Sequence, residues 1–312
     1  MIWLTNVLLC ITAWAACDLF YKAGTNIKDK NSHLKFLVWI GIINGIKVFC
    51  LLPLSGSGLP LARLISENAD HVLLILCYAA ALAFGIFGTR YMEISVMSPL
   101  ENVDGAIASL ALVVIFLIRG TVSISDYSLL DLTGVIFVII GIVYCGRIEQ
   151  NREGSASAKH NLRAKVLFFP LVYTLFDAAA MIFDGIVLSE EGGAVLGEFD
   201  YLMLTGAVFF IVGIFSYLYL RYIKKEKYNP FQKSELPRLG GAATETVGNI
   251  FYAFAVSQNP VLTAPIVTSY CILTVFGARI FLKEKLNHKQ YFCVAFLIIG
   301  IVLIAVSELP GI

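Results

Sequence analysis

Six carboxylic acids stand inside stretches of the sequence that are otherwise apolar: Asp18, Glu101, Asp104, Asp177, Asp184 and Glu245. A carboxylate inside a lipid bilayer is costly, so such a side chain must face a cavity, water or a partner. Against these acids, one base, Lys47, stands clearly inside an apolar stretch, while Arg90 and Arg279 stand near the ends of theirs. This excess of acid favours a cavity that binds cations or protons.

Glu101 and Asp104 are the most closely spaced of these acids, and they directly precede the apolar run 105–118. A helix of about 14 residues is about 21 Å long, whereas a bilayer core is about 30 Å thick. A spanning helix must therefore extend back through both acids, and their i, i+3 spacing places them on one helical face. Two carboxylates in a partly dry site cannot both ionise cheaply. We expect Glu101 and Asp104 to be the proton-coupling acids, with a structural Arg90–Glu101 ion pair as the alternative.

The other acids differ in their positions. Asp177 lies in the middle of its apolar stretch, and Asp184 lies two turns further on, near the outer surface, where solvation at the membrane interface would explain it. Glu245, Asn249 and Tyr252 form a polar stripe at i, i+4, i+7. In lipid such a stripe must face protein or water, so it either lines a cavity or forms hydrogen bonds between helices.

Aromatic side chains stand on the same stretches as the acids. Rings beside carboxylates suit ammonium groups through cation–π contact. The alternative is packing or a place at the membrane interface. The expected substrate-binding residues are Trp14, Asp18, Tyr78, Glu101, Asp104, Tyr173, Asp177, Glu245, Asn249, Tyr252 and Tyr270.

The composition predicts the setting of these residues. The chain of 312 residues is 58% hydrophobic and 14% charged, against roughly a quarter charged in soluble domains. We therefore expect an integral, multi-pass membrane protein with the lipid bilayer as partner. No basic run suggests a nucleic acid. The histidines fall in loops or at helix edges and the cysteines form no CxxC pair, so we expect no metal, cofactor or catalytic site.

Ten apolar stretches have about the length that crosses a bilayer. They cover residues 2–21, 34–54, 70–90, 97–118, 127–147, 164–188, 199–222, 239–257, 261–282 and 290–307. Lysines and arginines gather in the connections after the odd-numbered stretches, whereas the connection after the sixth is acidic. Because basic connections face the cytoplasm, we expect both termini outside, in a bacterial plasma membrane.

The hydrophilic segment 149–163 divides the chain into halves of five spans, residues 1–148 and 164–312. An odd number of spans forces the halves into opposite orientations, which is the inverted-repeat design of many secondary transporters. Asp18 and Asp177 each follow an aromatic residue by four positions, and Pro99 and Pro265 stand at similar places in spans four and nine. We expect Asp18 and Asp177 to approach one another across the axis that relates the halves.

The ninth span and the residues after it carry a family resemblance. They read Ala264-Pro-Ile-Val-Thr-Ser-Tyr-Cys-Ile-Leu-Thr-Val-Phe-Gly-Ala-Arg-Ile-Phe-Leu-Lys-Glu284-Lys-Leu. The Phe-Leu-x-Glu-x-Leu ending resembles the second repeat of the EamA-like branch of the drug/metabolite transporter superfamily. The resemblance implies two inverted five-helix repeats around a cavity lined by spans one, three, four, six, eight and nine. The sequence departs from the family at Gly105 and Cys271, where a proline is common, and at Arg119, near which a glutamate is common.

These patterns favour a secondary transporter of a small polar metabolite, amine-bearing or cationic, that works by alternating access with proton exchange at a buried acid. One alternative is an exporter of neutral amino acids or other metabolites in which the acids are only structural. An alternative of another class is a receptor or assembly subunit without transport. An enzyme is the weakest hypothesis, since no nucleophile or metal motif stands in the spans. The expected partners are a small-molecule substrate and protons, and the protein is expected to be a monomer or homodimer.

Overall fold

The computed structural model describes residues 2–25, 29–54, 60–91, 93–123 and 160–283, with scattered positions between 128 and 144 and between 288 and 303. All regular structure in these residues is helical. The longer helices are α1 (Ile2–Gly24), α2 (Ser32–Leu51), α4 (Ala69–Gly88), α6 (Asp104–Arg119), α8 (His160–Leu188), α9 (Glu198–Leu218), α10 (Leu236–Val256) and α12 (Cys271–Phe281). The shorter ones are η1 (Leu52–Leu54), α3 (Leu61–Glu67), α5 (Ile94–Glu101), η3 (Tyr219–Ile223), η4 (Lys233–Glu235) and α11 (Pro260–Thr268).

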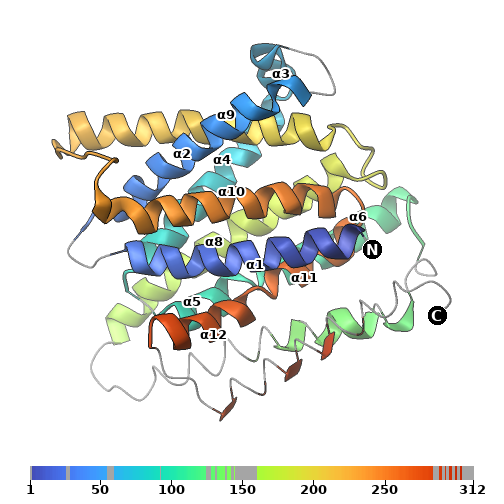
Figure 1. Ribbon diagram of the computed structural model, residues 1–312. Coiled ribbons are helices and arrows are strands. Elements are labelled where there is room, and N and C mark those ends of the chain that lie inside the picture. Colours follow the sequence, from blue (N-terminus) through green and yellow to red (C-terminus); the bar gives the residue numbers. More distant parts are fainter. Residues whose placement is uncertain are drawn as a thin grey trace.

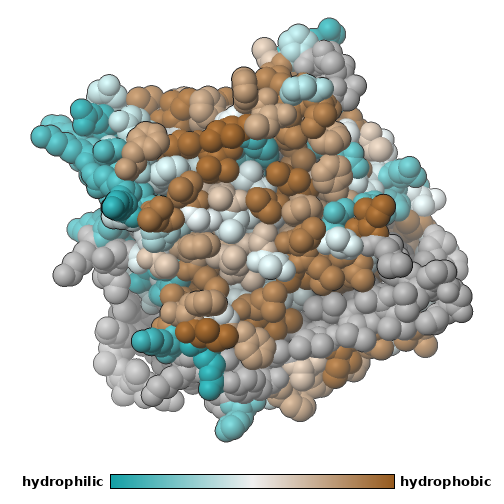
Figure 2. Space-filling model, in the orientation of Figure 1, coloured by the Kyte–Doolittle hydropathy of each residue, from teal (hydrophilic) through white to brown (hydrophobic). Residues whose placement is uncertain are grey.

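The helices run roughly along one direction, and Figure 1 shows α1 and α10 side by side near the middle of the bundle. Seven helical segments of the described residues are long and apolar enough to cross a membrane. Large apolar side chains on the outside of the bundle, such as Phe49 and Phe215, are exposed, as lipid contact requires. Hydrophobic residues cover the middle of the face in Figure 2, and hydrophilic residues gather toward its ends.

Helix α10 is absent from these seven apolar segments, although it has 21 residues. It packs against α1 and α2 and carries the buried polar residues Glu245, Thr246 and Asn249. A helix enclosed by other helices does not need an apolar surface, because its polar side chains meet protein instead of lipid. The polar stripe expected on the eighth span is therefore buried within the bundle.

Two of the seven segments are interrupted in the middle. Met97–Arg119 breaks between α5 and α6 at Asn102 and Val103, and Pro260–Phe281 breaks between α11 and α12. A proline lies inside each first half, Pro99 in α5 and Pro265 in α11, where it removes a backbone donor and disfavours a continuous helix. The expectation that Glu101 and Asp104 share a face of one continuous helix is wrong: Glu101 ends α5, and Asp104 begins α6.

The two interrupted segments touch near their breaks. A Cβ on Gly105 would lie 2.5 Å from the carbonyl oxygen of Ala264 and 2.3 Å from Thr268 Oγ1, so only glycine fits at this crossing of α6 and α11. The same close approach joins α2 to α9, where a Cβ on Gly41 would lie 2.7 Å from the Cα of Gly213. Small residues thus let helix backbones meet, as they commonly do in membranes.

Parts of the predicted topology lie outside the described residues. These are parts of the fifth span (127–147), most of the tenth (290–307), linker residues 149–159, and Glu284 with Leu286 of the family-like ending. Helix α8 begins at His160, inside the segment predicted as linker. The count of ten helices in two inverted repeats therefore stays a prediction.

Candidate functional site

Nine of the eleven residues expected to bind substrate meet around one pocket in the interior of the bundle, which we call the main pocket. It is lined by Trp14, Asp18, Tyr78, Glu101, Asp104, Tyr173, Asp177, Glu245 and Tyr270, together with Cys17, Tyr21, Asn102, Thr268 and other residues. The remaining two expected residues, Asn249 and Tyr252, line a smaller adjoining pocket that shares Trp14, Tyr78 and Asp177 and adds Asp184. No lysine, arginine or histidine is among the described residues that line either pocket.

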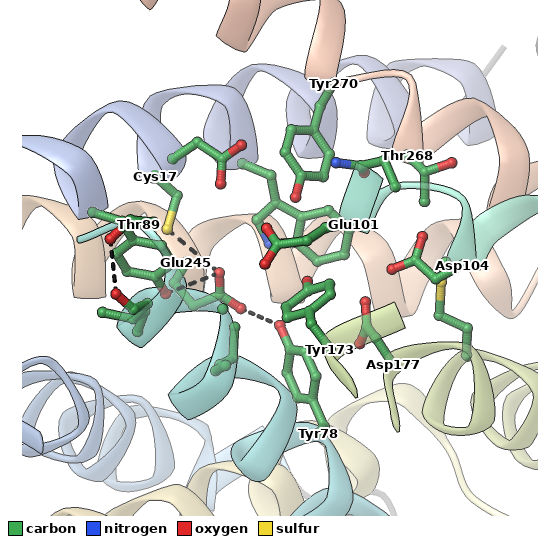
Figure 3. A pocket seen from close by; sticks show the side chains of 18 residues that line it. Cys17, Tyr78, Thr89, Glu101, Asp104, Tyr173, Asp177, Glu245, Thr268 and Tyr270 are labelled. Atoms are coloured by element: carbon green, nitrogen blue, oxygen red, sulfur yellow. Dashed lines mark hydrogen bonds between the residues drawn. The ribbon is translucent and has the colours of Figure 1, made fainter. Parts of the chain in front are cut away.

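Glu245 on α10 is the centre of a hydrogen-bonded cluster. The Tyr78 hydroxyl on α4 donates to Glu245 Oε1. The Tyr21 hydroxyl and the Cys17 thiol, both on α1, lie 3.5 Å from Glu245 Oε2 and donate to it. Figure 3 shows the Cys17 thiol and the Tyr78 hydroxyl both directed at Glu245. Three donors from two helices thus hold this buried carboxyl group in place.

Asp18 on α1 has a different environment. Its Oδ2 atom accepts hydrogen bonds from Ser98 Oγ on α5, at 2.6 Å, and from Thr274 Oγ1 on α12, at 3.1 Å. Both hydroxyl groups come from interrupted segments, so Asp18 links α1 to each of them. Asp18 and Asp177 were expected to approach one another. Both line the main pocket, but the hydrogen bonds of Asp18 go to Ser98 and Thr274.

Asp104 and Asp177 form the second acidic group. Their carboxyl groups lie close together, from the start of α6 and the middle of α8, and point toward one another in Figure 3. Two carboxylates this close in a buried site repel one another, so a proton shared between them is favoured. Asp104 also accepts from the Gly105 amide at 2.6 Å, at a helix start that favours negative charge. The partner of Asp104 is therefore Asp177, whereas the sequence had suggested Glu101.

Glu101 is buried, with 5% of its surface exposed, and its Oε1 atom has no hydrogen-bond partner among the described residues. It projects into the middle of the pocket in Figure 3. The Arg90 guanidinium, which the alternative hypothesis paired with Glu101, donates to the Lys30 carbonyl at 3.0 Å and lies against the rings of Phe87 and Tyr91. Glu101 thus offers an unused acceptor to whatever enters the pocket.

Aromatic rings form the wall between the two pockets. The Trp14 ring lies 5.3 Å from the Tyr252 ring and 5.8 Å from the Tyr270 ring, centroid to centroid. The indole rests on Gly248 of α10, where a Cβ would lie 2.3 Å from Trp14 Cδ1. Trp14 Nε1 is buried without a hydrogen-bond partner among the described residues. Ring faces and an open donor are therefore presented beside the carboxyl groups.

Lys47 on α2 is buried behind the α10 wall. Its Nζ atom donates to Asn249 Oδ1 at 3.3 Å, and a neighbouring pair, Asn44 and Thr246, is hydrogen bonded at 3.2 Å. Because Asn249 lines the adjoining pocket, Lys47 reaches the site through this amide. Lys47, the one base expected in the membrane interior, therefore supports the pocket wall and does not line the pocket.

Contacts between helix ends cover the main pocket near Thr89. Lys22 Nζ donates to the Thr89 carbonyl at 2.7 Å, and Thr89 Oγ1 donates to Thr25 Oγ1 at 3.2 Å. At the same end of the bundle, Asp29 lies 2.9 Å from Lys35 and 3.0 Å from Arg238. These bonds join the α1–α2 connection to α4 and α10.

Sequence reasoning left Cys17, Tyr21 and Asp184 out of the candidate site. Cys17 and Tyr21 lie at i+3 and i+7 from Trp14, so helical periodicity alone places them on its face. Asp184 was assigned to the solvated interface, yet it lines the adjoining pocket, seven residues from Asp177 on α8. All three residues could have been found by counting the helical repeat from a residue that was already a candidate, Trp14 or Asp177.

No family model matches the chain, and no curated protein matches it. Among solved structures, a crystal structure of a protein with 11% sequence identity superimposes on this chain with a TM-score of 0.64. The superposition covers 97% of this chain and 99% of the other chain. Its description gives neither organism nor activity. At this identity the match shows a shared fold over nearly the whole length, and nothing about the ligand.

Proposed function

We propose that the chain is a secondary transporter of small metabolites that carry an amine or another cationic group. The observation that carries this proposal is the main pocket: five carboxyl groups line it, from α1, α5, α6, α8 and α10, and no basic residue among the described residues lines it. Buried carboxyl groups without opposite charges favour a cation or protons in their company.

The interrupted helices support transport over simple binding. Each places helix ends in the interior of the bundle, and such discontinuous helices commonly form the substrate sites of secondary transporters. The halves of an inverted repeat then rock around a fixed site, which opens it to one side of the membrane at a time. We propose membership of the EamA-like branch on the same grounds, together with the ending of the ninth span.

Proton exchange follows from the same carboxyl groups. The close approach of Asp104 and Asp177 in a buried site favours one proton shared between them. A bound ammonium group favours ionised carboxylates, so its arrival releases a proton, and protonation in turn releases the substrate. Competition between substrate and proton for these acids is the coupling that we propose, with Glu101 as the first acid that the substrate meets.

A second candidate is an exporter of neutral metabolites in which the acids are structural. The hydrogen bonds of Asp18 favour this second candidate. Ser98 and Thr274 saturate one oxygen of Asp18, as a residue that ties helices together would require. The two candidates differ in the ligand. A thermal-shift screen of amines, amino acids and nucleosides on the purified protein separates them, because a ligand that binds the folded state raises apparent stability. Stabilisation by neutral compounds alone would favour the second.

The orientation in the membrane is proposed from the charge pattern, with both termini outside. Single cysteines at Ser155 and at Glu190 test it in a cysteine-free background. Glu190 is an exposed residue in the connection after α8. Gly193 in the same connection is a poorer site for a cysteine, because its φ of 113° disfavours a side chain. An impermeant thiol reagent should label Glu190→Cys in intact cells and leave Ser155→Cys unlabelled. The reverse pattern would invert the proposed topology.

A further inference from the structure

Three of the five carboxyl groups that line the main pocket lie on two opposite sides of it. Figure 3 shows Glu245 with Cys17 on one side and the Asp104–Asp177 pair on the other. The first group is built on α10 and the second on α6 and α8. Two separated anionic ends of one pocket match a ligand with two separated positive charges.

Glu101 gives an independent indication that a ligand enters between these ends. It is 95% buried, and its Oε1 atom lacks a hydrogen-bond partner among the described residues. A buried acceptor left unpaired costs about 1–3 kcal/mol, so a donor that arrives with a ligand is favoured. A Cβ on Gly85 would lie 3.0 Å from this atom, so α4 closes one side and the donor must come from within the pocket.

The space between the two ends suits an aliphatic chain. Tyr173, Tyr270 and Trp14 present rings there, and Leu82, Ile86 and Met181 add apolar surface. Methylene groups pack well against such side chains. Aromatic faces also attract an ammonium group wherever it stops along the chain.

We propose that the preferred substrate is a small aliphatic diamine, with one ammonium group beside Glu245 and the other beside Asp104 and Asp177. This inference rests on the proposed function and narrows its substrate class. A monoamine satisfies one end and leaves the other acidic group without a counter-charge. A diamine satisfies both, and its second ammonium group draws off the proton that the Asp104–Asp177 pair holds.

The test compares straight-chain diamines of three to six carbons with the n-alkylamines of equal carbon number. Binding is measured by thermal shift and by isothermal calorimetry on the purified full-length protein. We expect at least one diamine to bind about tenfold or more tightly than its matched monoamine, with an optimum in chain length. Glu245→Gln and Asp177→Asn should each reduce that ratio to near one. Glu190→Gln, the same charge change on an exposed residue outside the pocket, should leave it unchanged.

Cys17 supplies a second readout in a protein that keeps every residue lining the main pocket and has Cys17 as its one cysteine. Its thiol lies 3.5 Å from Glu245 Oε2, so an ammonium group at that end shields it. Diamines should slow alkylation of Cys17 more strongly than matched monoamines do, with the other cysteines replaced by serine or alanine. Equal affinity and equal protection by diamines and monoamines would overturn the diamine proposal and leave transport of amines standing. Absence of binding by every amine would instead overturn the proposed function itself.

Discussion

Asp104, the first residue of α6, and Asp177, in the middle of α8, lie close together and point toward each other on one side of the main pocket. The pair joins an interrupted helix to a continuous one, and two carboxyl groups this close in a buried site favour a shared proton, which a bound cation would displace. Because the same carboxyl groups can hold either the proton or the cation, the proton and the cation compete for them.

The first prediction concerns this proton. In Asp177→Asn the amide can donate a hydrogen bond to the neighbouring Asp104, but the exchangeable proton of the pair is gone. We expect amine binding to the wild type to release protons into a weakly buffered solution that contains a pH indicator, and binding to Asp177→Asn to release measurably fewer. Equal proton release from both proteins, at matched occupancy, would remove the pair from the coupling step.

The second prediction concerns Glu101. Its unpaired Oε1 atom makes it the acid most open to a substrate, so Glu101→Gln should weaken amine binding by at least about tenfold, or about 1.4 kcal/mol. The pH dependence of binding between pH 5.5 and 8.5 should also flatten, because one acid that competes for protons is gone. Calorimetry over this range on the folded variant is the measurement. An unchanged pH profile in a variant that still binds would exclude Glu101 from coupling.

The third prediction uses two glycines of α10. Gly248→Ala places a Cβ 2.3 Å from Trp14 Cδ1, so the indole must move out of the wall between the pockets. Gly240→Ala on the same helix meets only the ring of Phe20, at 2.9 Å, and that side chain is 38% exposed and free to rotate. We expect amine affinity to fall at least about tenfold in Gly248→Ala and to remain near wild type in Gly240→Ala. Similar affinities in both variants would show that the position of Trp14 does not matter.

The fourth prediction concerns pH and the ion pairs at the end of the bundle. Partial burial of Asp29 opposes its ionisation, but the hydrogen bond and charge of Lys35, with the charge of Arg238, outweigh burial and lower the pKa of the carboxyl group. A group whose pKa is lower in the folded state adds stability above its unfolded pKa, about 3.9 for aspartate, and loses it as the pH falls through the lowered folded value.

Asp29→Asn should therefore destabilise the protein by about 1–2 kcal/mol at pH 7. Its difference from the wild type should shrink below about pH 4. Thermal unfolding of both proteins in detergent across this range is the measurement. Glu67→Gln is the control: the Arg63–Glu67 pair has side chains 64% and 46% exposed, and such pairs contribute little. A constant gap between Asp29→Asn and the wild type at all pH values would contradict the assignment.

The sequence was sufficient to place the acids and rings around one pocket. Helical periodicity and the cost of charge in lipid act within a single span, so Trp14, Asp177 and Glu245 could be selected without a structure. Pro99 and Pro265 were noted as matching positions of the two halves, but the breaks of their helices were not predicted. The exact partners could not be found, because they depend on how spans distant in sequence meet: Asp104 with Asp177, Asp18 with Thr274, and Lys47 with Asn249. Gly248 carried no signal at all, since its importance comes from an indole on another helix.

The central claim, that this chain carries amine-bearing cations across a membrane through its acidic pocket, is tested most directly by counterflow in proteoliposomes. Vesicles that contain the purified protein are loaded with unlabelled 1,4-diaminobutane or n-butylamine and diluted into the labelled compound. We predict transient accumulation of label above that in protein-free vesicles for the wild type and Glu190→Gln, with at least a tenfold lower initial rate in Glu101→Gln. Label at the protein-free level, with folded and correctly inserted wild-type protein, would contradict the claim.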